Sequence, residues 1–226
     1  MGKRALYIIS MTLMLILLIA PINCIKAQFC CAEQRSQLDS ITPVLVENSI
    51  VTTNLDKYIA DKILITLQPY SDRSVPDLMI MAAKMLIGTP YVAGTLDKAD
   101  SHEQLTINLH QTDCIIFVET CLDLAITVHR SGKKATFKQF AENERVSRYR
   151  NGIIGSYSSR LHYTTEWIRQ SEKFGNIKDI TMSLGGDIYN HPIFFMSRNY
   201  QRYKQLSSAE ELNRIREIEN NLNKTP

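Results

Sequence analysis

The 226-residue sequence lacks the patterns that hold a metal ion or build a disulfide scaffold. It contains no C-x-x-C and no H-E-x-x-H, and its five histidines and five cysteines show no zinc-ligand spacing. Five cysteines do not make a disulfide scaffold in a chain of this length, and Cys114 and Cys121 lie two helical turns apart, too far for a bridge within one helix. We therefore expect no metal and no cofactor.

The sequence also lacks a nucleic-acid recognition motif, although its charge is uneven. Residues 1–129 hold 9 Lys and Arg against 13 Asp and Glu, whereas residues 130–226 hold 17 against 10. The basic residues of the second half are spread along the chain, which is typical of a solvated surface laced with salt bridges. A basic surface that faces an anionic polymer is the alternative, and we expect no nucleic-acid partner.

A long apolar run is absent except at the N-terminus. Lys3 and Arg4 precede the apolar residues 5–20, and small residues follow up to Ala27. This order is typical of a secretory signal and predicts a signal peptide over 1–27, with export to the bacterial periplasm or cell envelope. The run is shorter than the roughly 20 residues of a spanning helix, so an uncleaved signal is the only membrane anchor we consider. The polar residues 28–42 are expected to form a leader.

The pattern of apolar residues beyond this leader predicts a mostly helical α+β fold. Apolar periodicity and helix-start signals predict helices over 75–87, 114 to about 131, 137–148, 164–173 and 208–223, with one or two more between 43 and 67. Alternation predicts short strands over 105–109 and 180–184. The helix over 75–87 is apolar on two faces, with Ile80 and Ile87 on the second, which indicates deep burial.

The strongest chemical signal is Asp113-Cys114 at the start of an apolar helix. Asp113 occupies the N-cap position, and Cys114 falls in the first turn, where unpaired backbone N–H groups and the helix dipole stabilise a thiolate. A thiolate in that position is suited to act as a nucleophile. The alternative is core packing, since free cysteine is often buried, and it applies more strongly to Cys121 deeper in the helix.

Several segments together resemble one family. They are Leu86-Ile87-Gly88-Thr89-Pro90-Tyr91-Val92-Ala93-Gly94-Thr95-Leu96, then Asp113 to Glu119, then Tyr149-Arg150-Asn151-Gly152 and Gly155-Ser156-Tyr157, and finally Ser159-Arg160-Leu161-His162-Tyr163 with Trp167. In this order they resemble the NlpC-type papain-like cell-wall amidases and peptidases, specifically the N-acetylmuramoyl-L-alanine amidase-like branch. The resemblance covers residues 45–226 and implies that 43–226 is the N-terminal part of such a domain.

The resemblance assigns roles to individual residues. Cys114 would attack the amide that joins the lactyl group of N-acetylmuramic acid to L-alanine, in a muropeptide or peptidoglycan fragment. Tyr91 would help to position the substrate or the oxyanion. Arg160 and His162 would lie in the cleft, with a buried structural hydrogen-bond pair as their alternative. Asp113 would cap the helix, with or without a part in the chemistry.

The sequence departs from the family pattern at two places. Ile115 and Ile116 stand where the family carries small hydroxyl residues. The general-base histidine of the family lies in a β-rich half after the last helix, and no counterpart of that half is present. We therefore expect a chain that is inactive alone and is either truncated by a gene break or completed by a second polypeptide, a complementing C-terminal segment. The rival interpretation is a non-catalytic remnant that binds muropeptides or has no function.

Overall fold

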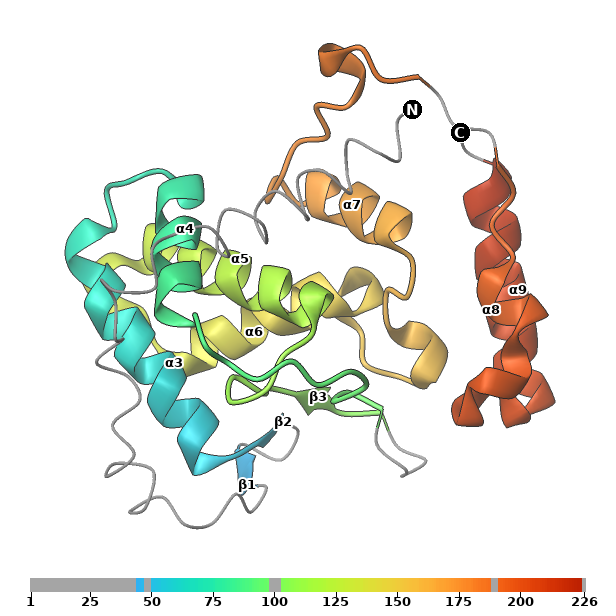
Figure 1. Cartoon of the computed structure of the whole chain (residues 1–226), viewed down its shortest axis with the longest axis horizontal. Coiled ribbons are helices and arrows are strands. Elements are labelled where there is room, and N and C mark those ends of the chain that lie inside the picture. The colour runs from blue at the N-terminus through green and yellow to red at the C-terminus, as the bar shows by residue number, and fades with distance from the viewer. Residues whose placement is uncertain (1–43, 47–49, 98–102, 188–190, 225–226) are drawn as a thin grey trace. The chain divides into compact units, whose positions relative to one another are not determined.

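The protein, described by a computed structural model for residues 44–46, 50–97, 103–187 and 191–224, is a mostly helical α+β protein with a few short strands (Figure 1). The predicted fold class is thus confirmed, whereas the predicted signal peptide (1–27) and leader (28–42) lie outside the described residues. The helices are α3 (Asn54–Leu67), α4 (Val75–Met85), α5 (Cys114–Ser131), α6 (Phe137–Arg148), α7 (Thr164–Lys173), α8 (Phe195–Arg198) and α9 (Ala209–Lys224). The strands are β1 (Val44–Val46), β2 (Ile50–Thr52) and β3 (Leu105–Thr106).

The chain divides into two compact units. The N-terminal unit contains the described residues between 44 and 97 and those from 104 to 147. The C-terminal unit contains Glu103 and the described residues from Arg148 onward. Each unit is considered separately below.

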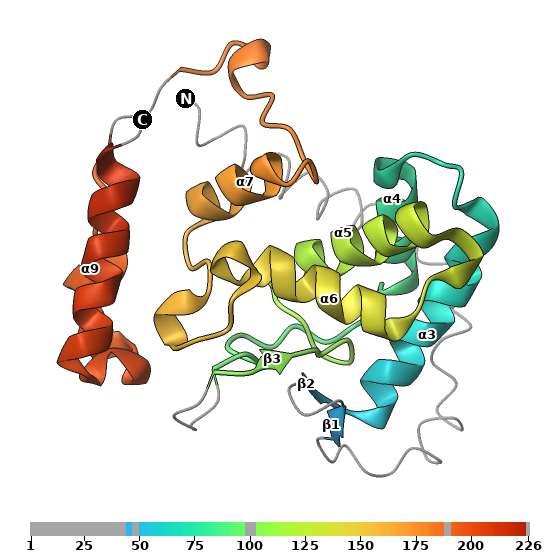
Figure 2. The ribbon, with the colours of Figure 1, turned by 180° about the vertical axis from the view of Figure 1, so that it is seen from behind.

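The N-terminal unit is organised around α5. Residues 119–128 of this helix are all buried, so it has no solvent-facing stripe. It packs against α3 and α4 on one side, and Figure 2 shows α6 on the other. Hydrogen bonds between buried polar side chains join α5 to α6: Thr120 to Glu144 at 2.9 Å, Ser147 to Asp123 at 2.7 Å and Asn143 to Thr127 at 2.8 Å. Since these polar groups find partners in each other, their burial is tolerated.

A small sheet closes one side of this unit. Strand β2 pairs antiparallel with β1 and parallel with β3, with Val51 opposite Thr106. Strand β2 leads directly into α3, whose N-cap Thr53 forms a capping box with Asp56. The sequence had predicted only helix for this region, so the strands β1 and β2 are an addition.

The C-terminal unit has its own apolar cluster. Tyr157, Met196, Leu206 and Ile215 are buried together, with Tyr163, Tyr203 and Ile218 packed against them. The apolar face of α9 supplies Ile215 and Ile218, as its periodicity predicted. The buried Glu219 on the same helix accepts a hydrogen bond from the Tyr163 hydroxyl at 2.6 Å and one from the Ser197 amide at 2.9 Å.

Two predictions about local structure are wrong. Residues 180–184 do not form a strand; they contain a 3₁₀ turn, Met182–Leu184, in which Leu184 is 67% exposed. Asp179 accepts a hydrogen bond from the Thr181 amide, and Gly185 ends the turn in the left-handed region with φ of 80°. The second face of the helix predicted over 75–87 is also not deeply buried, because Ile80 is 46% exposed and Ile87, which lies beyond the end of α4 at Met85, is 42% exposed.

Candidate active site

Cys114 is the first residue of α5, and its side chain is exposed. The carboxylate of Asp113 caps the helix: its Oδ1 accepts hydrogen bonds from the amides of Ile115 at 3.0 Å and Ile116 at 2.9 Å. The Phe117 amide donates to the Asp113 carbonyl at 2.9 Å. Core packing is therefore not the environment of Cys114. Its thiol lies at the positive end of α5, where a negative charge is stabilised.

Cys121 offers the opposite environment on the same helix. Its side chain is 0% exposed, two turns into α5. Burial, reinforced by the nearby Glu144 carboxylate, raises the pKa of the Cys121 thiol far above its ordinary value. This cysteine packs in the core and is unsuited to nucleophilic chemistry, as predicted.

The Tyr91 loop is held against the segment that leads into α5. Tyr91 forms an isolated parallel β-bridge with Thr112, two residues before Cys114. The Val92 amide donates to the Thr112 carbonyl at 2.9 Å, and the Thr112 amide donates to the Pro90 carbonyl at 3.0 Å. The side chain of Tyr91 is 63% exposed. The loop thus fixes Tyr91 beside the Cys114 segment and leaves its ring and hydroxyl available for a ligand.

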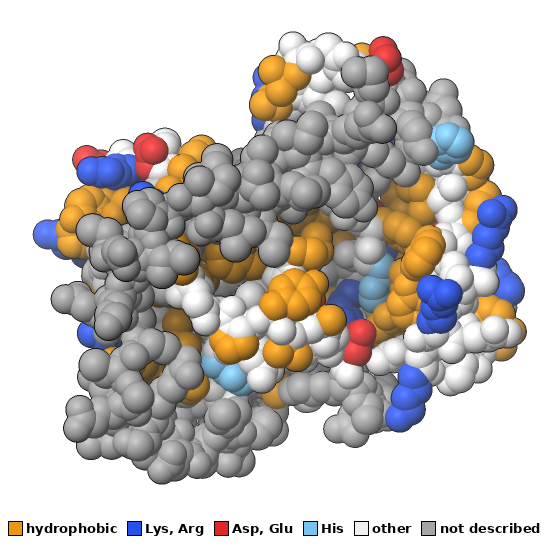
Figure 3. Space-filling model, in the orientation of Figure 1, with side chains coloured by type: hydrophobic (Ala, Val, Ile, Leu, Met, Phe, Trp, Pro, Cys, Tyr) orange, Lys and Arg blue, Asp and Glu red, His pale blue; other side chains and the backbone are white. Residues whose placement is uncertain are grey.

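Apolar side chains surround the exposed cysteine. Ile115 is 49% exposed, and Val92 and Tyr91 are also exposed; Figure 3 shows hydrophobic side chains reaching the surface of the N-terminal unit. Part of the Cys114 helix and of the Tyr91 loop is therefore exposed.

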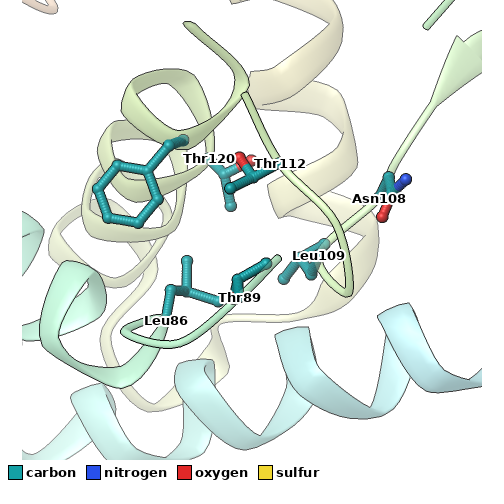
Figure 4. A pocket seen from close by; sticks show the side chains of 7 residues that line it. Leu86, Thr89, Asn108, Leu109, Thr112 and Thr120 are labelled. Atoms are coloured by element: carbon teal, nitrogen blue, oxygen red, sulfur yellow. The ribbon is translucent and has the colours of Figure 1, made fainter. Parts of the chain in front are cut away.

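A small cavity lies beneath this surface. It measures about 10 Å³ and is lined by Leu86, Thr89, Asn108, Leu109, Thr112, Phe117 and Thr120 (Figure 4). This volume holds at most one water molecule, so the cavity is not a substrate pocket. Its lining includes Thr112, which precedes the α5 N-cap, and Phe117 in the first half of α5.

One residue near this site was missed by sequence reasoning. Asp56, in the first turn of α3, accepts hydrogen bonds at its Oδ1 from the amides of Leu109 and His110 and from the His110 ring. The Thr53-x-x-Asp56 spacing indicates a capping box and could have predicted the helix start. It carries no signal for the contacts with residues 109 and 110, which are more than 50 positions away in the chain.

The predicted cleft residue Arg160 lies in the C-terminal unit and is engaged in internal contacts. Its Nε lies 2.9 Å from Glu103 Oε1, and its guanidinium lies 4.7 Å from the centre of the Tyr157 ring. Glu103 also accepts a hydrogen bond from the Tyr149 hydroxyl at 2.8 Å. Tyr149 and Arg160 in turn form an isolated antiparallel β-bridge. These contacts join the two family-like segments around 150 and 160 into one scaffold.

His162 belongs to the same scaffold. Its Nε2 donates a hydrogen bond to the Tyr157 carbonyl at 2.8 Å, and its ring lies 4.4 Å from the ring of Tyr157. Burial, helped by the positive charge of Arg160, lowers the pKa of His162 from 6.5 to about 4. His162 is therefore neutral at pH 7. Roles for Arg160 and His162 in substrate binding remain predictions.

Among the described residues, no group of three His, Cys, Asp or Glu side chains is arranged to hold a metal ion. Within the same part of the chain, no helix has the length and apolarity that a membrane span requires.

Residues 81–226 match the AmiA-like family, described as N-acetylmuramoyl-L-alanine amidase-like. The chain belongs to this family, and the matched region contains Tyr91, Asp113, Cys114, Arg160 and His162. A search among curated proteins gives no match.

Solved structures show the same likeness. The chain is similar to an N-acetylmuramoyl-L-alanine amidase from Bacteroides uniformis ATCC 8492, with 34% identity and a TM-score of 0.61 over 66% of this chain and 61% of that chain. A second structure with the same name gives 36% identity and a TM-score of 0.60 over the same shares. A Bacteroides fragilis protein named as a candidate xylanase gives 35% identity and a TM-score of 0.55, over 59% of this chain and 57% of that chain. The chain spans about 61% of the length of the two amidase structures.

Proposed function

We propose that the chain is a cell-wall hydrolase of the N-acetylmuramoyl-L-alanine amidase type, with a papain-like (NlpC-type) fold and Cys114 as its nucleophile. The observation that carries the proposal is the exposed thiol at the first position of α5, inside the region that matches the family. The names of the Bacteroides uniformis structures support peptidoglycan or a muropeptide as the substrate class.

In the proposed reaction, the Cys114 thiolate attacks the carbonyl carbon of the amide between the lactyl group and L-alanine. The C–N bond breaks, the peptide leaves with a protonated amine, and a thioester to Sγ remains. Water then hydrolyses the thioester and regenerates the thiol. The helix dipole of α5 favours the thiolate in the first step.

The oxyanion of this reaction needs hydrogen-bond donors at the same place. Asp113 accepts from the amides of Ile115 and Ile116, so these two first-turn donors are occupied. Among the described residues, no acceptor is seen for the Cys114 amide itself. We assign that amide as an oxyanion donor, with the exposed Tyr91 hydroxyl as a second group that contacts the substrate. The isoleucines at 115 and 116 leave this backbone donor unchanged.

A thiolate nucleophile works with a base that also protonates the leaving amine. His162 donates a hydrogen bond from Nε2 to the Tyr157 carbonyl and has a pKa lowered to about 4, so it is a poor base near neutral pH. We propose that the base is a histidine of a β-rich segment that complements residues 43–226. This arrangement is what the resemblance to NlpC-type enzymes implies.

The test is an amidase assay with anhydro-muropeptides, in which release of the peptide with a free L-alanine amine is measured. We expect turnover when the purified chain is supplemented with the part of the Bacteroides uniformis amidase that the structural match does not cover. Cys114→Ala should reduce that turnover at least about a thousandfold, as for other covalent catalysts. Cys121→Ala is the matched control on the same helix and should retain activity.

Three outcomes would overturn the proposal. One is turnover that survives Cys114→Ala. Another is the absence of both turnover and a Cys114 thioester in the complemented protein, which is the result expected for a non-catalytic remnant. The third is release of reducing sugar from xylan in place of muropeptide cleavage.

Export is part of the same proposal, because peptidoglycan lies outside the cytoplasm. We propose cleavage of the signal near Ala27 and a mature protein that starts close to Gln28. N-terminal sequencing of the protein from the periplasmic fraction tests this. Full-length protein that starts at Met1 in the soluble cytoplasmic fraction would contradict it.

A further inference from the structure

A buried carboxylate outside the family-matched region holds the segment that carries the candidate nucleophile. Asp56 lies in α3, whereas the family match begins at residue 81. Asp56 is 1% exposed, and its two carboxylate oxygens bind different parts of the N-terminal unit. A buried carboxylate is costly unless several donors reach it, so its partners indicate what it stabilises.

The Oδ2 oxygen serves the start of α3. It accepts a hydrogen bond from the Thr53 amide at 3.2 Å and one from the Thr53 hydroxyl at 2.6 Å. The Asp56 amide donates to the Thr53 hydroxyl oxygen at 3.1 Å. These contacts complete an ordinary capping box.

The Oδ1 oxygen serves a distant segment. Three donors converge on it: the Leu109 amide at 2.7 Å, the His110 amide at 3.0 Å and the His110 Nδ1 at 2.7 Å. A capping box does not require these contacts. They fix the direction of the backbone at residues 109 and 110, just before the chain enters α5.

Three further contacts continue from this point to the cysteine. The Gln111 amide donates to the Asn108 side chain at 2.9 Å, and Thr112 is held by the backbone of residues 90–92. Asp113 then caps the helix. Hydrogen bonds therefore hold the backbone at each step from Leu109, which is bound by the Asp56 carboxylate, to the first turn of α5, which is capped by the Asp113 carboxylate.

We infer that Asp56 is a positioning residue for the Cys114 nucleophile. Its Oδ1 anchors residues 109–110, so that Thr112 meets the Tyr91 loop and Asp113 meets the amides of α5. The inference rests on the proposed function in assigning Cys114 as the nucleophile. Its own readout is the reactivity of the thiol, which needs no substrate.

The experiment compares the alkylation rate of Cys114 by iodoacetamide in the purified chain and three variants, resolved by peptide mass spectrometry. Asp56→Ala removes both sets of contacts and should slow alkylation of Cys114 about fivefold near neutral pH, because the cap that holds the first turn loses its support. Asp56→Asn keeps an Oδ1 acceptor and should restore the rate to within about twofold of the original chain.

Thr53→Ala is the matched control for a purely structural role. It removes the side-chain partner of Oδ2 and lowers stability through the start of α3, but leaves the three donors to Oδ1 in place. Cys114 should therefore keep its alkylation rate in Thr53→Ala even if the Tm falls. Equal slowing in Thr53→Ala and Asp56→Ala at an equal loss of Tm would overturn the inference, as would an unchanged rate in a folded Asp56→Ala.

Cys121 reports whether each variant is folded, since it is buried and should stay unlabelled in folded protein. If Asp56→Ala does not fold, hydrogen exchange of the original chain tests whether Asp56 holds residues 109 and 110. The amides of Leu109 and His110 should be protected from exchange, and exchange at the rate of an unstructured peptide would overturn the inference. If the complemented protein fails the amidase assay while the chain shows the Asp56 effect on Cys114, the proposed function is refuted and Asp56 remains the anchor of the Cys114 segment.

Discussion

The start of α5 and the 149–163 segment both carry residues that resemble the same family, yet they use polar groups in opposite ways. At the start of α5, the carboxylates of Asp113 and Asp56 satisfy backbone amides, and the Cys114 side chain remains exposed. In the 149–163 segment, the side chains of Arg160 and His162 are themselves bound to Glu103 and to the Tyr157 carbonyl.

This difference separates a chemical site from its scaffold. A nucleophile must keep its reactive atom free, whereas a residue that organises a loop must bind its partners in the resting protein. By that criterion, Cys114 and Tyr91 are candidates for contact with substrate. The present contacts of Arg160 and His162 are those of residues that hold the loop together.

The largest expected effect concerns the two thiols of α5. Iodoacetamide at neutral pH should modify Cys114 at least about a thousandfold faster than Cys121, because Cys121 reacts only when the unit opens globally. Site-resolved mass spectrometry over a time course measures both rates. Equally slow labelling of both cysteines in folded protein would show that Cys114 is packed in the core and would remove the basis of the comparison.

The next effect tests Arg160 against Tyr91. Arg160→Ala removes the Arg160 guanidinium from the nearly buried Glu103 carboxylate and should lower the free energy of unfolding by about 3 kcal/mol. Tyr91→Ala removes an exposed side chain and should change it by less than about 0.5 kcal/mol.

Urea unfolding followed by circular dichroism measures both changes. If Arg160→Ala were as stable as the original chain, the ion pair would not be structural. Arg160 would then be a candidate for substrate binding on the same footing as Tyr91.

Local sequence signals predicted the helices well. The ranges 137–148 and 164–173 agree with α6 and α7 at both ends, and the Asp113 cap lies where the sequence placed it. Caps and apolar periodicity depend on residues within one or two turns, so they can be recognised without the fold. The exposure of Cys114 is different, because the sequence left core packing open as an alternative and only the structure shows that this side chain is exposed.

The features that the sequence did not predict correctly depend on residues far apart in the chain. Ile180, Met182 and Leu184 alternate like a strand, but a strand also needs a neighbour to pair with, and this segment instead forms local hydrogen bonds to Asp179 and Ile180. Asp56 shows the converse, because its local spacing predicts only a cap, whereas its contacts with Leu109 and His110 depend on how α3 packs.

The smallest expected effect concerns His162, whose pKa of about 4 lies below the ordinary value of 6.5. Between pH 4 and 6.5 the unfolded chain binds a proton at this ring that the folded chain does not, so the unfolding free energy falls as pH is lowered through this window. The stability from His162 is complete above pH 6.5 and is lost towards pH 4. Because the side chain is only partly shielded from water, we expect a loss of about 1–2 kcal/mol between pH 7 and 4.5.

His162→Gln keeps an N–H donor for the Tyr157 carbonyl but does not titrate, so its urea midpoint should fall less over this range. If the urea midpoints of the two proteins fell equally with pH, the His162 ring would take up a proton in the folded state. His162 would then be accessible like Cys114, and it would no longer be a purely structural residue.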